Sequence, residues 1–349
     1  MEEFTIMKKG LFFIALFFPF FLFSNVKIAL DVDSIIWNGN GEQAYDVFDS
    51  EEYVQEVPIA VYYNYEGDES ENKSGGEKIR DYISFFLNLR REGKDYFITI
   101  SKGMHSSRKL SSGFYEMQYQ IYSQQSKSNV IKGDGEAISS SDVIEGAFLS
   151  RGLGWKRSNF SDEKKCYLSI PALQIVKSGV YQDTYTVKVF SGSIEDTSFQ
   201  EEDSKEVTFT VFVPSIVQML LGDSSMGFEE NKILHSIDFG ELMENDRRDL
   251  DICIRSNSSY LISIESENKG FLIHQDHFGK KNNANRVPYD LTLDGKKQDL
   301  SKRIELAVSN KVTDVHGERR SLSIAIGKVD YPRSGKYKDS IFMTCLALD

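Results

Sequence analysis

The motif Ser-Gly-x-Tyr-x-Asp occurs twice in this chain of 349 residues, beginning at Ser178 and at Ser334. Each copy opens a run of β-branched, aromatic and aliphatic residues, which predicts a β-strand after a turn. The first copy is followed by another strand-forming run, Val207–Val213. After the second copy comes only its own strand, Ile341–Leu348, and then Asp349. We therefore expect two related units, of which only the first has a later strand to pair with.

Short apolar runs separated by turn signals fill the rest of the chain, and sustained helical spacing is almost absent. This pattern predicts an all-β protein built of antiparallel sandwiches. Further strands are expected at Val26–Val32, Tyr45–Phe48, Val57–Tyr63, Tyr82–Leu89, Tyr96–Ile100, Phe114–Tyr122, Cys166–Val176, Val180–Phe190, Ile216–Leu221, Ile237–Gly240, Leu250–Arg255, Tyr260–Ser266, Phe271–Ile273, Val287–Leu293, Ile304–Val308 and Leu322–Val329.

Three further pairs of segments recur in the same order as the motif. They match Tyr96–Ile100 with Tyr260–Ile264, Tyr119–Ile121 with Tyr289–Leu291, and Leu168–Ile170 with Leu322–Ile324. Chance likeness between apolar strands is the alternative for any single pair. The conserved order favours two related domains, predicted at 25–213 and 214–349, with the boundary where Pro214 ends a strand.

The N-terminus predicts an exported protein. Lys8 and Lys9 precede the apolar run Leu11–Phe23, which is too short to span a bilayer and suits a secretory signal peptide, here 1–24. Met7 is an alternative start, and a retained anchor is the alternative to cleavage near Ser24.

The chain carries 41 Lys and Arg against 53 Asp and Glu, and the acidic excess lies mainly between Asn25 and Val213. That balance argues against nucleic acid and anionic membranes as partners of the first half, and solubility alone is the alternative explanation of the charge. Cys166, Cys253 and Cys345 form no Cys-x-x-Cys pair. A Cys253–Cys345 disulfide would form if their strands were neighbours, and buried free thiols are the alternative.

The sequence predicts no enzyme and no cofactor. It lacks a Gly-x-Ser-x-Gly elbow, a P-loop and a dinucleotide fingerprint. His274-x-x-His277 has no clear third ligand, so we expect no metal site.

The spacing Leu250-x-Ile252-x-Ile254-x-Ser256-Asn257-x-x-Tyr260, followed by Val287-Pro288-Tyr289 and Ser334-Gly335-x-Tyr337-x-Asp339, resembles the spore coat protein U domain. The resemblance covers most of 214–349 and, more thinly, 25–213. That family supplies pilins of archaic chaperone–usher pili. It implies immunoglobulin-like sandwiches, with the C-terminal one lacking its final strand. The family's paired cysteines near the start of the domain are not evident here.

The resemblance implies a strand-accepting groove at the last strand. Apolar residues on both faces predict that this strand is buried between layers, with Phe342, Thr344, Leu346 and Leu348 on one face and Met343, Cys345 and Ala347 on the other. The groove residues are predicted to be Ile341, Phe342, Met343, Thr344, Leu346 and Leu348. Strand addition would place a periplasmic chaperone, and then the adjacent pilin subunit, at this edge during assembly by an outer-membrane usher.

The predicted function is a structural and adhesive pilus subunit at the cell surface, with the tip as its predicted position because Val26–Val32 leaves little chain to donate as a strand. The alternatives are a free-standing secreted binding module and a shaft pilin whose Val26–Val32 projects freely. If the first domain is the adhesin, its contact with an unknown surface or host ligand is predicted at Phe148, Leu149, Leu153 and Trp155, with Trp37 a weaker candidate. The alternative is that these side chains fill the core.

Overall fold

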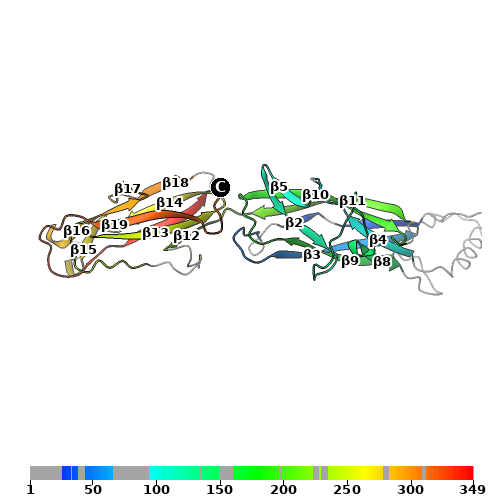
Figure 1. Ribbon diagram of the computed structural model, residues 1–349, viewed down its shortest axis with the longest axis horizontal. Coiled ribbons are helices and arrows are strands. Elements are labelled where there is room, and N and C mark those ends of the chain that lie inside the picture. The colour runs from blue at the N-terminus through cyan, green and yellow to red at the C-terminus, as the bar shows by residue number, and fades with distance from the viewer. Residues whose placement is uncertain are drawn as a thin grey trace, which may run out of the picture.

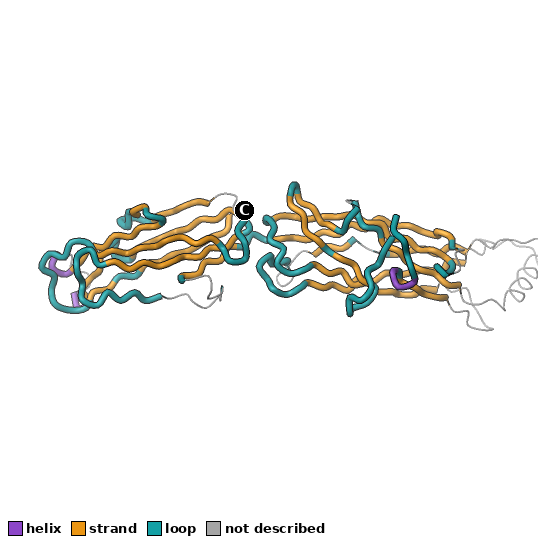
Figure 2. The backbone as a smooth tube through the Cα atoms, in the orientation of Figure 1, coloured by secondary structure: helices purple, strands orange, loops and turns teal. Residues whose placement is uncertain are grey.

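The computed structural model describes residues 26–32, 34–37, 44–65, 94–104, 106–133, 135–148, 160–195, 199–222, 228, 235–277, 283–308 and 312–348. The predicted signal peptide and the predicted strand Tyr82–Leu89 lie outside these residues. Strands dominate the described chain, and its helical pieces are short 3-10 turns (Figure 2). Within it, no helix has the length and apolar character needed to cross a membrane.

Two β-sandwiches lie end to end, and the all-β prediction is confirmed (Figure 1). Each sandwich has its own hydrophobic core. The chain passes from the first to the second between Val213, where one strand ends, and Val217, where the next begins. We place the domain boundary there.

The first sandwich packs a sheet of four strands against a larger one. The smaller sheet has the order β1 (Val26–Asp31), β3 (Tyr53–Tyr65), β9 (Phe160–Ile170) and β7 (Gln120–Tyr122). The larger has the order β2 (Ile35–Trp37), β11 (Gln200–Val213), β10 (Gly179–Ser191), β4 (Lys94–Ile100) and β8 (Ile144–Phe148). The hairpin of β5 (Lys109–Ser112) and β6 (Tyr115–Gln118) joins it at β10, and a 3-10 turn, η1 (Ser140–Asp142), precedes β8.

The second sandwich repeats this arrangement with fewer strands. One sheet has the order β12 (Val217–Leu221), β13 (Arg247–Ser256), β19 (Glu318–Ile326), β16 (Arg286–Leu293), β15 (Phe271–His274) and β20 (Tyr337–Lys338), with β17 (Lys296–Gln298) beside β16. The other holds β18 (Ile304–Val308), β14 (Ser259–Ser266) and β21 (Ile341–Leu348). The 3-10 turns η3 (Gln275–His277) and η4 (Asn283–Asn285) connect β15 to β16.

The repeated segments of the sequence occupy equivalent strands. Tyr96–Ile100 forms most of β4 and Tyr260–Ile264 most of β14, and each pairs with the strand that follows its motif. The other two pairs of segments fall on β7 and β16 and on β9 and β19. Alternation explains the packing, because the inward positions of β10 and β16 are buried and the outward ones are more exposed.

The tyrosine of each motif closes a corner at the start of its strand. The Tyr181 hydroxyl donates to the Lys177 carbonyl at 2.7 Å, and the Tyr337 hydroxyl donates to the Arg333 carbonyl at 2.8 Å. Both bonds run four residues back, as in the tyrosine corners of immunoglobulin-like domains. In the second motif the glycine is needed for space, since a Cβ at Gly335 would lie 2.1 Å from Nε2 of His274.

The aspartate of each motif ties its strand to the opposite sheet. Asp183 is buried and accepts from the Tyr119 hydroxyl at 2.7 Å. Asp339 accepts from the Tyr289 hydroxyl and from the Ser266 hydroxyl, the latter at 2.7 Å. Burial is the larger cause, and the hydrogen bond to the aspartate carboxylate the second, that raises the pKa of Tyr119 and of Tyr289 far above the ordinary tyrosine range.

Two predicted strands are wrong. Tyr45–Phe48 folds as a turn in which the Asp46 carboxylate accepts the Phe48 amide at 2.8 Å, although Tyr45 and Val47 are fully buried. Ile237–Gly240 is irregular, with the Asp238 carboxylate accepting the Gly240 amide at 2.8 Å. In both, a side chain of aspartate replaces a strand's backbone partner.

The junction between the sandwiches is built around Asn257, which is completely buried. Its side chain accepts from the Ile216 amide at 2.8 Å and donates to the Pro214 carbonyl at 2.9 Å. Its carbonyl accepts from the Ser178 amide of the first sandwich at 3.1 Å. The two sandwiches are therefore joined by hydrogen bonds as well as by the linker.

Candidate strand-acceptor site

The motif strands of the two sandwiches differ in their neighbours. In the first sandwich β10 lies between β4 and β11, and its antiparallel pairing with β11 extends from Gly179 to Ser191. In the second, β21 pairs with β14 alone among the described strands. The described part of the second sandwich holds no counterpart of β11. One edge of β21 is left without a backbone partner there.

The strand that faces this open edge of β21 is β12. It forms the edge of the opposite sheet and lies beside β21. Val217, Met219 and Leu221 of β12 pack against the core and stay partly exposed. On β21 the same holds for Ile341, Met343 and Cys345. Partly exposed apolar side chains thus line these two neighbouring strand edges, and we refer to the strip between the edges as the cleft.

The core beneath the cleft is less complete than the core of the first sandwich. Among the described residues, the first core contains 29 buried apolar side chains and 5 partly buried ones packed against them. The second contains 14 buried and 15 partly buried. The partly buried set includes the inward residues of both β12 and β21, so the incompleteness extends to this edge.

The predicted groove residues divide between the two faces of β21. Ile341 and Met343 face the core, as does Cys345, which was not among the predicted groove residues. Phe342 and Leu346 point outward and are 60% and 62% exposed, and Thr344 lies exposed between them. Alternation puts Leu348 on their side. The expectation that β21 is buried on both faces is therefore wrong, because within the described chain no layer covers its outer face.

Sequence reasoning missed the β12 residues. Their alternation, Val217-x-Met219-x-Leu221, is visible in the sequence. What it lacks is the topology, which alone shows that the first and last strands of the unit border the same cleft.

The cysteines form no disulfide. Cys166 and Cys253 are buried and Cys345 is partly buried, and all three are free thiols. Cys253 pairs with Leu220 and lies on the face of β13 opposite the core residues Ile252 and Ile254, whereas Cys345 faces the core. Burial raises the pKa of the Cys345 thiol to about 11.

The predicted adhesive residues do not all meet. Phe148 ends β8 opposite Lys94, at the end of the first sandwich away from the junction. Its ring stacks on Tyr96 with 4.9 Å between centroids and packs against the core. Trp37 pairs with Val211, close to the junction end, and its side chain is outside the described part. Leu149, Leu153 and Trp155 are also outside it.

Histidine 274 has a structural environment. Nε2 of His274 lies 3.0 Å from the Ser334 carbonyl oxygen, and its ring meets that of Tyr337 edge-on. The His277 side chain is outside the described part. Among the described residues, no cluster of three or more His, Cys, Asp or Glu side chains is arranged to hold a metal ion.

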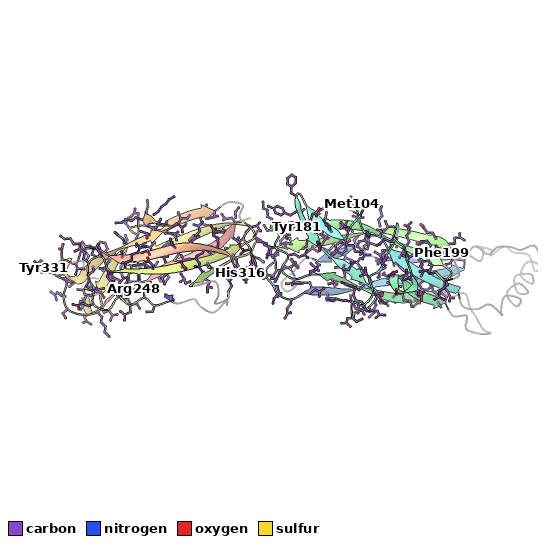
Figure 3. The ribbon with its side chains drawn as sticks, in the orientation of Figure 1. Met104, Tyr181, Phe199, Arg248, His316 and Tyr331 are labelled. Carbon is purple, nitrogen blue, oxygen red and sulfur yellow. The ribbon has the colours of Figure 1, made fainter. Side chains whose placement is uncertain are left out.

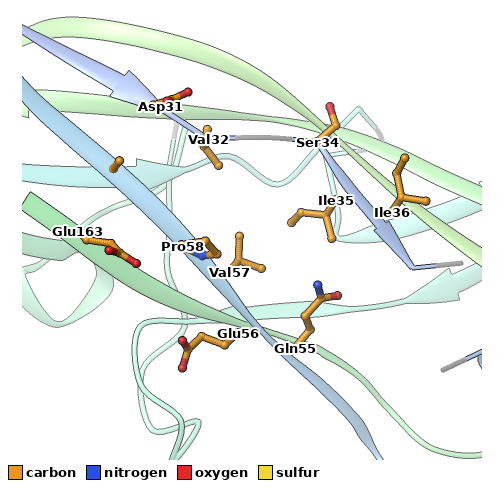
Figure 4. Close-up of a pocket in the computed structure, with 11 residues that line it drawn as sticks. Asp31, Val32, Ser34, Ile35, Ile36, Gln55, Glu56, Val57, Pro58 and Glu163 are labelled. Carbon is orange, nitrogen blue, oxygen red and sulfur yellow. The ribbon is translucent and has the colours of Figure 1, made fainter. Parts of the chain in front are cut away.

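A pocket of about 340 Å³ lies where the chain crosses from β1 to β2 (Figure 4). Val32, Ile35 and Val57 give it an apolar floor, and carboxylates stand at its rim. Two of these are already paired, Asp31 with Lys205 and Glu56 with Lys165.

Comparison with known proteins reaches the same family that the sequence suggested. Residues 91–188 match the Spore Coat Protein U domain. The match lies in the first sandwich, whereas the motifs above placed the resemblance mainly on 214–349. No curated protein matches the chain.

Solved structures of similar architecture cover most of the chain at low identity. One is a chain of the CsuC–CsuE chaperone–tip adhesion subunit pre-assembly complex from archaic chaperone-usher Csu pili of Acinetobacter baumannii. It is 14% identical with a TM-score of 0.43, and the match covers 91% of this chain and 100% of that one. Another is the CupB6 tip adhesin of Pseudomonas aeruginosa. It is 10% identical with a TM-score of 0.36, and the match covers 91% of this chain and 94% of that one. A third is CfaE, the adhesive subunit of CFA/I fimbria of enterotoxigenic Escherichia coli. It is 12% identical with a TM-score of 0.29, and the match covers 93% of this chain and 87% of that one.

The fold described above rests on this chain's own strand pairing. The motif copy at Ser178 falls within the matched residues, on β10. Its repetition at Ser334, with the same tyrosine corner, extends the likeness to the second sandwich. Over residues 91–188, less than half of its length, the chain is similar to the spore coat protein U domain.

Proposed function

We propose that this chain is a two-domain subunit of a chaperone–usher pilus, located at its tip, whose second sandwich accepts a strand from another subunit. The observation that carries the proposal is the contrast between β10, paired with β11, and β21, paired only with β14 in the described chain. A strand added between β21 and β12 would supply the missing backbone partner and cover the partly exposed core.

The N-terminal strand supports the tip position. β1 pairs with β3 over six residues, from Val26 opposite Tyr65 to Asp31 opposite Ala60. A shaft pilin would need this segment free for donation, and releasing it would break the sheet. The described β1 is therefore suited to completing its own sandwich rather than a neighbour's.

The partners that follow from this proposal are a periplasmic chaperone, an usher and an adjacent pilin, with the subunit displayed at the cell surface.

Adhesion would take place at the end of the first sandwich away from the junction. β4, β8 and β9 have ends there, and residues 149–155 directly follow β8. Replacing Leu149 and Leu153 by serine should reduce surface attachment of piliated cells and leave the amount of assembled pilus unchanged.

Cys345 offers a direct test of strand acceptance in the full-length protein. Cys166 and Cys253 are each 1% exposed, so alkylation of the native protein should modify Cys345 first. Because its pKa is raised to about 11, the reaction should be slow at neutral pH and is best followed near pH 8.5. The probe is a peptide of about ten residues with alternating Val or Ile and Thr, flanked by lysines.

The peptide should bind the protein and slow Cys345 alkylation, with mass spectrometry locating the modified cysteine. A peptide of the same composition in scrambled order, which breaks the alternation, is the control. Equal alkylation rates with both peptides, together with no detectable binding, would refute strand acceptance and favour a free-standing module.

A further inference from the structure

The outer face of β21 carries apolar side chains that the filling of the cleft does not explain. Phe342 and Leu346 point away from the core and are 60% and 62% exposed. They stand four residues apart on one face, roughly 13 Å along the strand. Two large exposed apolar groups on an edge strand are an aggregation risk unless something covers them.

Leu346 belongs to an apolar row that ends at the open edge. It lies opposite Leu261 of β14, which in turn lies opposite Ala307 of β18. All three are on the outer face of the sheet, because their neighbours Tyr260 and Ile262 are in the core. Phe342 has Glu265 as its neighbour on β14. An added strand would be the next member of each row.

The first sandwich shows how the equivalent row is covered. Aligning the two motifs matches Leu346 with Phe190, and aligning the paired strands matches Leu261 with Phe97. Phe190 stacks on Phe97 at 5.0 Å between centroids. Phe199 meets both rings edge-on, at 5.3 Å from Phe97 and 5.6 Å from Phe190, and Phe97 is only 1% exposed.

Phe199 immediately precedes β11, the strand that completes the first sandwich (Figure 3). The segment leading into the completing strand therefore brings the side chain that covers the outer row, while the β11 residue opposite Phe190 is Glu201. The described second sandwich has the row without the strand and without its covering residue. The same partner should supply both.

We propose that the strand donated to β21 is apolar on both faces, with large outward side chains opposite Phe342 and over Leu346 in addition to the inward ones that fill the cleft. This inference rests on the proposed function. The occupant we assign is the donor segment of the adjacent pilin subunit, because a chaperone that departs would leave both side chains in water.

The donor's direction follows from the first sandwich, where β11 is antiparallel to β10. In an antiparallel donor, two residues four positions apart lie opposite Phe342 and Leu346. The donor residue midway between those two lies opposite Thr344. The expected pattern is five consecutive residues that are apolar except for a polar one at the centre.

Two peptides of about ten residues, flanked by lysines, test this on the full-length protein. Both carry Val or Ile at the inward positions. One has Phe at the two outward positions opposite Phe342 and Leu346, and the other has Thr there. Cross-strand apolar pairs predict that the Phe peptide binds about three- to tenfold tighter, measured by fluorescence anisotropy.

A Phe342→Thr, Leu346→Thr double variant should bring this ratio close to one. Both sites are mostly exposed, and threonine suits a strand, so the variant should fold. The matched control is Val180→Thr with Phe212→Thr, an exposed cross-strand pair of the first sandwich, which should leave the ratio unchanged.

Equal affinity of the two peptides for the wild-type protein, with both protecting Cys345, would overturn the two-faced donor and leave strand acceptance standing. A preference that survives in the double variant would also overturn it. Failure of both peptides to bind would refute the acceptor function itself, and this inference with it.

Discussion

At the scale of single residues, the motif aspartates join the two sheets of each sandwich. Asp183 accepts from the Tyr119 hydroxyl and from the Met104 amide, the latter at 3.1 Å. Asp339 accepts from the Tyr289 hydroxyl and from the Asn268 amide, the latter at 3.0 Å. Each carboxylate is therefore satisfied by a tyrosine of the opposite sheet together with backbone.

Removing one tyrosine hydroxyl should destabilise only its own sandwich. Tyr119→Phe and Tyr289→Phe each leave a carboxylate without one donor, which costs about 1–3 kcal/mol of unfolding free energy. Urea unfolding monitored separately for each sandwich measures the loss. Tyr331→Phe, at a side chain 95% exposed, is the control and should change nothing. Equal stability of all three variants would contradict the role of the hydroxyls.

Buried tyrosines also set the alkaline limit of stability. Burial raises the pKa of Tyr45 to about 12, and its hydroxyl donates to the Pro171 carbonyl at 2.7 Å. Because the folded pKa is above the unfolded value of 10, its contribution is complete below pH 10 and falls as pH rises toward 12. Tyr45→Phe should make stability of the first sandwich depend less on pH between 10 and 12, as measured by denaturant unfolding. An unchanged slope would contradict this.

At the scale of elements, the two motif strands report on how complete each sheet is. β10 pairs with β11 over its whole length and, on its other side, with β4 from Val187 to Ser191 and with β5 at Gln182, whereas β21 has β14 on one side in the described chain. An antiparallel strand directs about half of its amides to each edge. The β21 amides that point to its free edge, about half of them, thus have no ladder partner in the described chain.

Hydrogen exchange should separate the two strands. We expect about half of the amides of Ile341–Leu348 to exchange rapidly, while most of Gly179–Ser191 is protected. Addition of the donor peptide should slow exchange in β21 and leave β10 unchanged, as read by mass spectrometry of overlapping fragments. Protection of β21 equal to that of β10 without any added strand would rule out an open edge.

At the scale of the whole molecule, the two sandwiches should differ in stability. The first has about twice as many buried apolar side chains in its described core. Buried apolar area is the main favourable contribution to folding, so the second sandwich should unfold first. The hydrogen bonds of Asn257 link the two without merging their cores.

Tryptophan fluorescence can isolate the first sandwich, since both tryptophans, Trp37 and Trp155, precede Val213. Heating should show two transitions by far-ultraviolet circular dichroism, and only the later one by tryptophan fluorescence. The donor peptide should raise the earlier transition alone. One shared transition by both probes, unmoved by peptide, would show that the second sandwich is no less complete than the first.

The sequence by itself determined the elements and their repetition. Alternating apolar residues and turn signals suffice for most strands because the pleat has a period of two, as at β4, β10 and β16. They fail at Tyr45–Phe48, where apolar residues are buried without being a strand. There a local hydrogen bond to Asp46 competes with the ladder.

Only the tertiary structure decided which strands are neighbours and which face of β21 is covered. The sequence marks Phe342 and Met343 alike as apolar, yet one is exposed and the other packs on the core. The sequence also does not show that β12 and β21 border the same cleft, since Val217 and Ile341 are far apart in the chain. Burial is a property of what lies across the sheet, and a strand's own residues do not encode which segment that will be.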